Sequence, residues 1–174
     1  SRAVTTTNAL SGFDVAPSTT FTVGQTILGT GALTKTNTGT LILQGANSYQ
    51  GGTTISAGLL QIAADNNLGN ASGSLTLNGG VLATTNTFTL SGNRAVITSN
   101  ALGGFDVAPS TTFTVDQTIL GSGGLTKTNT GTLVLNGTNT YQGGTTISGG
   151  NLQVANDSGL GSATGFLTLN GGSL

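Results

Sequence analysis

The chain has 174 residues and a formal net charge of −1, and only 5 % of its residues are charged, against roughly 25 % in average soluble domains. This balance gives no electrostatic reason to bind nucleic acid or an anionic membrane, and no apolar run reaches the ~20 residues of a membrane helix. The chain has no cysteine, which excludes disulfides and thiolate metal sites, and its 30 glycines lack the three-residue period of collagen. These features predict a β-rich fold with many tight turns.

Short alternating segments predict strands along the whole chain, and no window has the 3.6-residue apolar period of a helix. In the first half the expected strands cover residues 3–6, 21–23, 25–28, 40–44, 53–56, 59–63, 75–78 and 88–91. Glycine or asparagine fills the turns between them, where a positive φ is often required. Pro17 and Pro109 each precede a strand, where a missing N–H does least harm.

The second half of the chain repeats the first at a shift of 92 residues. Residues 2–82 and 94–174 share about 61 identities in 81 positions, and Arg2 falls on Arg94. A chain that is one unit written almost twice is a repeat protein. We therefore divide it into repeat 1 at 1–93 and an incomplete, continuous repeat 2 at 94–174.

The strand starts predict the architecture. They lie at Phe21, Thr40, Leu59, Leu75, Ala95 and Phe113, and five such steps span one repeat. We therefore expect an all-β, right-handed parallel β-solenoid (β-helix) without helix. It would have about 18 residues per coil, five coils per 92-residue repeat and about nine coils in all. The rival fold is a pair of immunoglobulin-like sandwiches, which usually need a core tryptophan that this chain lacks.

Alternation within the strands assigns the two faces. We expect these side chains inside: Val4, Phe21, Val23, Ile27, Leu41, Leu43, Ile55, Leu60, Ile62, Leu75, Leu77, Leu82, Phe88 and Leu90. The second copy supports this assignment, because it changes residues on the expected outer face. These changes are Leu59 to Asn151, Val81 to Ser173 and Gln44 to Asn136.

One stretch, present in both copies, resembles a known family. Its order is carried by Gly31, Leu33, Lys35, Gly39, Thr40, Leu41, Leu43, Gly45, Asn47, Tyr49, Gly51, Thr53, Ile55 and Gly58. This order resembles the passenger-associated transport repeat, also called the autotransporter-associated β-strand repeat. The family usually has glycine where this chain has Asn37 and Asn129, and asparagine tolerates the left-handed conformation well.

The resemblance implies a parallel β-solenoid in a protein exported to the bacterial cell surface by Gram-negative autotransport. It implies an extracellular location. The lack of cysteine would then avoid premature cross-links in the oxidising periplasm.

The residues offer little for catalysis, because histidine, cysteine and glutamate are all absent. We predict no catalytic residue, no metal or other cofactor, and no enzyme activity. The alternative is a β-helix that binds or cleaves polysaccharides, for which Asp14, Asp106, Arg2 and Lys35 are the residues to consider.

The same residues also have structural interpretations. Asp14 and Asp65 lie in turn-like contexts, where a carboxylate binds nearby backbone. Lys35 and Lys127 precede glycine corners and are expected to reach solvent or carbonyl groups there. Tyr49 and its copy could stack on a sugar, but an aromatic ring also serves to cover a corner.

We therefore predict a structural stalk or spacer of a large secreted surface protein, with a filament unit or a carbohydrate-binding domain as alternatives. Open strand edges at both ends should be covered by further repeats or by a neighbouring molecule. We expect residues like 83–92 to follow Leu174, and a similar segment to precede Ser1.

Overall fold

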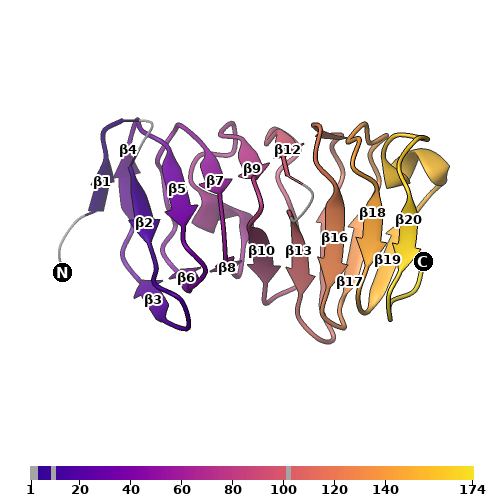
Figure 1. Cartoon of the computed structure of the whole chain (residues 1–174). Coiled ribbons are helices and arrows are strands. Elements are labelled where there is room, and N and C mark those ends of the chain that lie inside the picture. Colours follow the sequence, from indigo (N-terminus) through magenta and orange to yellow (C-terminus); the bar gives the residue numbers. More distant parts are fainter. Residues whose placement is uncertain (1–3, 9–10, 101–102) are drawn as a thin grey trace.

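A computed structural model of the chain describes residues 4–8, 11–100 and 103–174. Its strands stack side by side in one elongated body, from the N-terminal to the C-terminal end (Figure 1). All strand pairs of the described residues are parallel, so the predicted all-β parallel solenoid is confirmed.

Each turn of the solenoid passes over three faces. The eight-stranded sheet contains β3 (Thr20–Val23), β6 (Thr40–Leu43), β8 (Leu59–Ile62), β10 (Val81–Thr84), β13 (Gly104–Val107), β16 (Leu125–Thr128), β18 (Thr145–Ile147) and β20 (Leu167–Leu169). The six-stranded sheet contains β2 (Gly12–Asp14), β5 (Leu33–Thr36), β7 (Thr53–Ile55), β9 (Leu75–Leu77), β12 (Val96–Thr98) and β15 (Ile119–Leu120).

The third face is shared by two smaller sheets. The two-stranded sheet contains β1 (Val4–Thr6) and β4 (Ile27–Gly29), and the four-stranded sheet contains β11 (Phe88–Thr89), β14 (Thr112–Val115), β17 (Thr132–Leu135) and β19 (Asn151–Val154). Between them the stack continues without regular strands, through backbone hydrogen bonds from Ser48 to Ile27 and from Asn70 to Tyr49, each 2.9 Å.

The coil is longer than the sequence predicted. The in-register step varies along the stack, because Thr40 pairs with Leu59 whereas Phe88 pairs with Phe113, a longer step. Between Phe21 and Leu169 the eight-stranded sheet makes seven steps, which gives roughly 21 residues per coil. The predicted shorter coil, with five coils per repeat and nine in all, is therefore wrong.

The miscount has a simple geometric cause. Leu59 pairs with Val81 in the next coil, whereas Leu75 lies in β9 on the six-stranded sheet. The spacing from Leu59 to Leu75 therefore measures a step between faces rather than a complete turn.

The longer coil also rotates the repeat about the axis. Lys35 in β5 belongs to the six-stranded sheet, while its copy Lys127 in β16 belongs to the eight-stranded sheet. Likewise β6 lies in the eight-stranded sheet and its copy β17 in the four-stranded sheet. One repeat thus occupies four coils and one further face.

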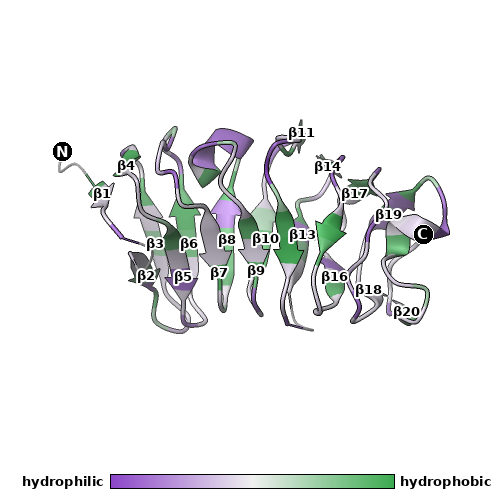
Figure 2. Ribbon diagram, turned by 90° about the horizontal axis from the view of Figure 1, so that it is seen from above, coloured by the Kyte–Doolittle hydropathy of each residue, from purple (hydrophilic) through white to green (hydrophobic). Residues whose placement is uncertain are grey.

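Inward side chains form one continuous apolar core, and most of the predicted inward residues are buried in it. Apolar segments recur in strands along the stack, for example in β6 and β13 (Figure 2). Val4 and Phe88 are only half-buried but pack against the core. Phe21 is 49 % exposed because β3 begins its sheet, whereas its copy Phe113 is fully buried.

The expectation of no helix fails at two places. Residues Asp65–Leu68 form η1 and Asp157–Leu160 form η2, each a single 3₁₀ turn of four residues. Asp65 lies where the sequence predicted a turn, so the difference is local. The predicted outer residues Leu59 and Val81 are partly exposed, and Gln44, Asn136 and Asn151 are exposed.

Candidate functional site: polar anchors inside the solenoid

Two lysines point into the solenoid, and neither side chain is exposed. The Lys35 ammonium donates hydrogen bonds to three carbonyl oxygens, those of Thr36 (2.8 Å), Asn37 (2.7 Å) and Ala57 (3.3 Å). Lys127 repeats this cage at 2.7, 2.8 and 3.2 Å. Each ammonium therefore ties the corner of its own coil to the corner of the next coil. Of the two predicted outcomes, solvent or carbonyl groups, the second is correct.

Burial lowers the pKa of both lysines from the ordinary 10.5. The charges of Asp14 near Lys35 and Asp106 near Lys127 act in the opposite direction and raise the pKa. The ammonium groups hydrogen-bond backbone carbonyls rather than these carboxylates. Such a group is held for structure, because its donors are already satisfied.

Asparagine occupies the corner beside each lysine. Asn37 has a φ of 64° and Asn129 a φ of 65°, as the sequence predicted for positions where glycine is usual. The Asn37 amide donates to Asp14 at 2.9 Å, and the Asn129 amide donates to Asp106 at 2.9 Å. The aspartates lie in strands β2 and β13 rather than in turns, so the turn interpretation of Asp14 is wrong. Each carboxylate holds a corner of the following coil.

The two tyrosines are fully buried. The Tyr49 hydroxyl lies 2.7 Å from the Thr53 hydroxyl, and the Tyr141 hydroxyl lies 2.6 Å from that of Thr145. Burial raises the pKa of each phenol to about 12. A buried ring cannot stack on a sugar, so the corner-filling interpretation is correct.

Arg94 is also fully buried, and no pattern in the sequence indicates its role. Its Nε lies 3.0 Å from the Asp65 carboxylate, which is 22 % exposed. The guanidinium further donates to the carbonyl oxygens of Leu68 (3.2 Å), Gly73 (2.8 Å) and Gly69 (3.3 Å). Asp65 and these carbonyls come from the segment 65–73, one coil before the arginine. We call this arrangement the arginine socket.

Asparagines hold the stack where regular strands end, beyond β4 on the third face and beyond β15 on the face of the six-stranded sheet. The Asn47 side chain accepts a hydrogen bond from the Ile27 amide at 2.7 Å and donates to the Asn67 carbonyl at 2.6 Å. Asn139 makes the same pair of contacts with Ile119 at 2.8 Å and Gly159 at 2.7 Å. Side-chain amides thus replace backbone ladder bonds between three successive coils.

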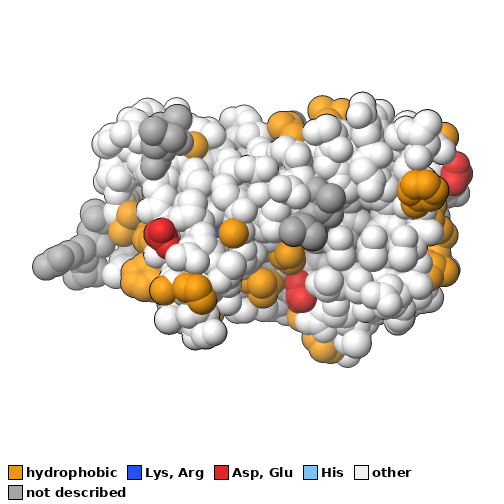
Figure 3. All heavy atoms as spheres, in the orientation of Figure 1, with side chains coloured by type: hydrophobic (Ala, Val, Ile, Leu, Met, Phe, Trp, Pro, Cys, Tyr) orange, Lys and Arg blue, Asp and Glu red, His pale blue; other side chains and the backbone are white. Residues whose placement is uncertain are grey.

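Among the described residues considered for polysaccharide cleavage, Asp14 lies near Lys35, but Asp106 does not join them. Lys35 is enclosed, Asp14 and Asp106 lie on different sheets, and Arg2 is outside the described residues. Among the described residues on the face that Figure 3 displays, acidic side chains are visible and basic side chains are not. Within residues 4–8, 11–100 and 103–174, no three acidic side chains gather as metal ligands would. Over the same ranges no helix is long and apolar enough to span a membrane.

The fold and its internal polar anchors define a class, that of repeat proteins built as parallel β-solenoids. The family named Passenger-associated-transport-repeat matches residues 33–62 and 125–154, the two segments that contain the caged lysines. The chain therefore carries two copies of this repeat.

One curated relative is an autotransporter. The chain is 44 % identical over 127 residues to "Adhesin BmaC autotransporter" of Brucella suis biovar 1 (strain 1330). The alignment covers 72 % of this chain but 4 % of that protein, so the chain spans a small part of its relative's length. No solved structure matches the chain.

Proposed function

We propose that this chain is a structural spacer in the passenger of an autotransporter, located outside the cell on the bacterial surface, and that it has no enzyme activity. Similarity to an autotransporter adhesin supports the surface location. The observation that carries the spacer role is the use of the interior charges. The cations Lys35, Arg94 and Lys127 are all fully buried and hydrogen-bonded to backbone.

The partners we propose are further repeats of the same parent chain. Residues 1–93 and 94–174 would then be two units of one continuous solenoid. Both ends support this. At the N-terminal end Phe21 lines an open pocket. Its copy Phe113 is instead covered by Phe88 of the preceding coil, with the two ring centroids 5.0 Å apart. At the C-terminal end Leu167 and Leu169 are exposed, whereas their copies are buried.

Deletion of one complete repeat from the parent passenger tests the spacer role. We expect export and adhesion to persist while the passenger projects less far from the cell in electron tomograms. A loss of about 21 Å would correspond to four and a third coils at about 4.8 Å per coil. As a control, replacing the repeat by its other copy should leave the length unchanged.

Two outcomes would overturn the proposal. The first is adhesion that disappears with the deletion, returns when the repeat is put back, and does not return when its aspartate, Asp14 or Asp106, is replaced. The second is specific binding of a glycan by the isolated chain, which would favour the carbohydrate-binding alternative.

A further inference from the structure

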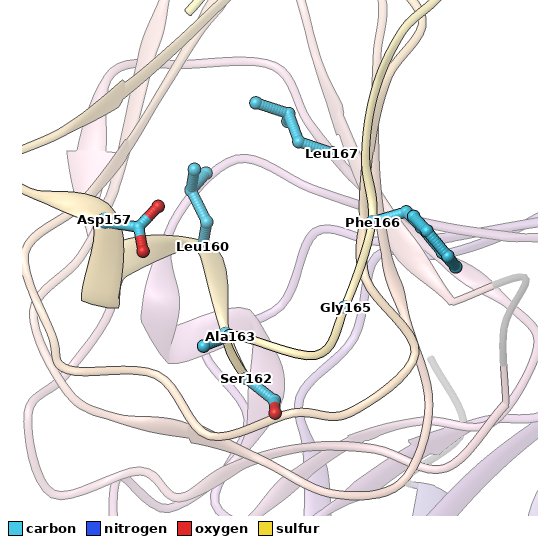
Figure 4. A pocket seen from close by; sticks show the side chains of 8 residues that line it. Asp157, Leu160, Ser162, Ala163, Gly165, Phe166 and Leu167 are labelled. Atoms are coloured by element: carbon cyan, nitrogen blue, oxygen red, sulfur yellow. The ribbon is translucent and has the colours of Figure 1, made fainter.

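A pocket of about 100 Å³ opens at the C-terminal end of the solenoid. It is lined by η2 and by the segment leading into β20, including Asp157, Leu160, Gly161, Gly165 and Leu167. In Figure 4 Asp157 and Leu160 point into the space between these two segments, and Phe166 points away from it. Phe166 is 86 % exposed, so its ring does not close the pocket.

The lining of this pocket has a counterpart in the arginine socket. At the shift between the two repeats, Asp157 corresponds to Asp65 and Leu160 to Leu68. Gly161 and Gly165 correspond to Gly69 and Gly73, whose carbonyls accept from Arg94. The carboxylate and all three carbonyl-bearing residues of the socket are therefore retained.

The two loops also share their backbone geometry. Gly69 has a φ of 75° and Gly161 a φ of 86°, which favour glycine in both. The Ser162 amide donates to the Tyr141 carbonyl at 2.8 Å, as the Asn70 amide does to that of Tyr49 at 2.9 Å. The pocket is thus formed in advance, with its acceptors already in place.

From this match we propose that the pocket binds the guanidinium of an arginine from a further repeat, at the position that Arg94 holds in repeat 2. Asp157 accepts from the guanidinium, and the carbonyls of Leu160, Gly161 and Gly165 accept its remaining N–H groups. The planar fork of arginine suits this set of acceptors, and the single point charge of lysine does not. The inference rests on the proposed stacking of repeats.

The Asp157 carboxylate and the exposed Leu167 at the rim of the pocket both point to a following coil as the occupant. In the arginine socket the coil that delivers Arg94 also delivers β12, which pairs with β9 and covers Leu75. Leu167, the copy of Leu75, is 42 % exposed. A coil that brings an arginine to the pocket would cover this leucine in the same step. The arginine therefore acts as a lock between consecutive repeats.

The test extends the chain by the part of the next coil that would cover the pocket. A copy of residues 83–98 is appended after Leu174, which places an arginine and a strand equivalent to β12 over β20. Amide hydrogen exchange then measures the protection of residues 167–169. In the extended chain, Asp157→Asn should lower this protection at least ~10-fold, since the buried guanidinium loses its carboxylate partner. In the unextended chain the same variant should have less than a ~2-fold effect, because no arginine follows Arg94 there.

A double-mutant cycle completes the test. Replacing the appended arginine by glutamine should lower the protection of residues 167–169 by the same factor as Asp157→Asn. The two changes together should lower this protection no further than either change alone. An Asp157→Asn effect of equal size in both chains would overturn the lock. An appended segment that exchanges as fast as an unfolded peptide would instead defeat the stacking of repeats, and with it the proposed function. A protected segment that is indifferent to Asp157 defeats the lock alone.

Discussion

At the level of single residues, the solenoid separates apolar stacking from polar anchoring. Leu43 in β6 is 1 % exposed among stacked side chains, whereas Leu59 in β8, the neighbouring strand of the same sheet, is partly exposed. Repeat 2 keeps leucine at the first position, as Leu135, and has Asn151 at the second. The internal comparison of two copies thus identifies the core without any homologue.

This contrast gives a stability prediction. Leu43→Asp places a charge among buried apolar side chains and should lower the free energy of unfolding by about 3–5 kcal/mol. Leu59→Asn, the change already present in repeat 2, should alter it by less than about 1 kcal/mol. Urea denaturation followed by circular dichroism measures both. Equal losses in the two variants would mean that the inner and outer faces are misassigned.

The buried tyrosines predict a response to alkaline pH. Their pKa is raised to about 12 in the folded chain, against 10.0 for an exposed phenol. Below pH 10 the phenols are protonated in both states, and between pH 10 and 12 the unfolded chain ionises first. The stability that they contribute is therefore lost as pH rises through this window, on the order of 2 kcal/mol per tyrosine.

Replacing Tyr49 and Tyr141 together by phenylalanine isolates this effect. The lysines act in the opposite sense, because their pKa is lowered and stability rises as pH approaches 10.5. The double variant should therefore lose less stability than the parent between pH 10 and 12. If its denaturation midpoint falls as steeply as that of the parent, the buried phenols are not the titrating groups.

At the level of elements, alternation predicts most strands and fails where a polar residue faces inward. It does not predict strand β5, because Lys35 occupies an inward position between Leu33 and the corner. It also predicts a turn in place of strand β2, for a different reason: Asp14 is exposed and aspartate is common in turns, whereas this carboxylate holds the next coil. When the alternation counts Lys35 as an outward residue, the segment around it no longer resembles a strand. These same charges are the polar anchors, so the sequence conceals the site together with the strands.

The sequence does not predict the arginine socket either, because no local pattern joins its residues. Asp65 and Arg94 lie 29 residues apart, more than one coil, and neither belongs to a spacing pattern that suggests a pair. The signal that was available is the repetition of Asp65 as Asp157 and of Arg2 as Arg94. Only the true coil length shows that Asp65 meets the arginine of the following repeat.

At the level of the whole molecule, the coil length decides how repeats are oriented. Four coils and one face per repeat turn each copy by a third of a revolution, so three copies would complete thirteen coils before the pattern returns to the same face. A repeat of five coils would instead keep every copy on one face. The two arrangements differ in which residues are neighbours across coils.

Introduced cysteine pairs can test directly which residues are neighbours across coils, because the chain has no cysteine of its own. Leu59 and Val81 are in-register partners with partly exposed side chains. Adjacent parallel strands lie about 4.8 Å apart, within the Cα separation that a disulfide tolerates. The pair Leu59→Cys with Val81→Cys should therefore cross-link under mild oxidation and move faster on a non-reducing gel.

The matched control is Leu59→Cys with Thr76→Cys, which places the second thiol on the six-stranded sheet. This pair is close to the spacing expected for the shorter coil and should stay reduced within the monomer. The copy of the first pair, Asn151→Cys with Ser173→Cys, should also cross-link, because these residues form a parallel bridge on the neighbouring face. Cross-linking of the control pair at the rate of the other two would contradict the longer coil and the rotation that follows from it.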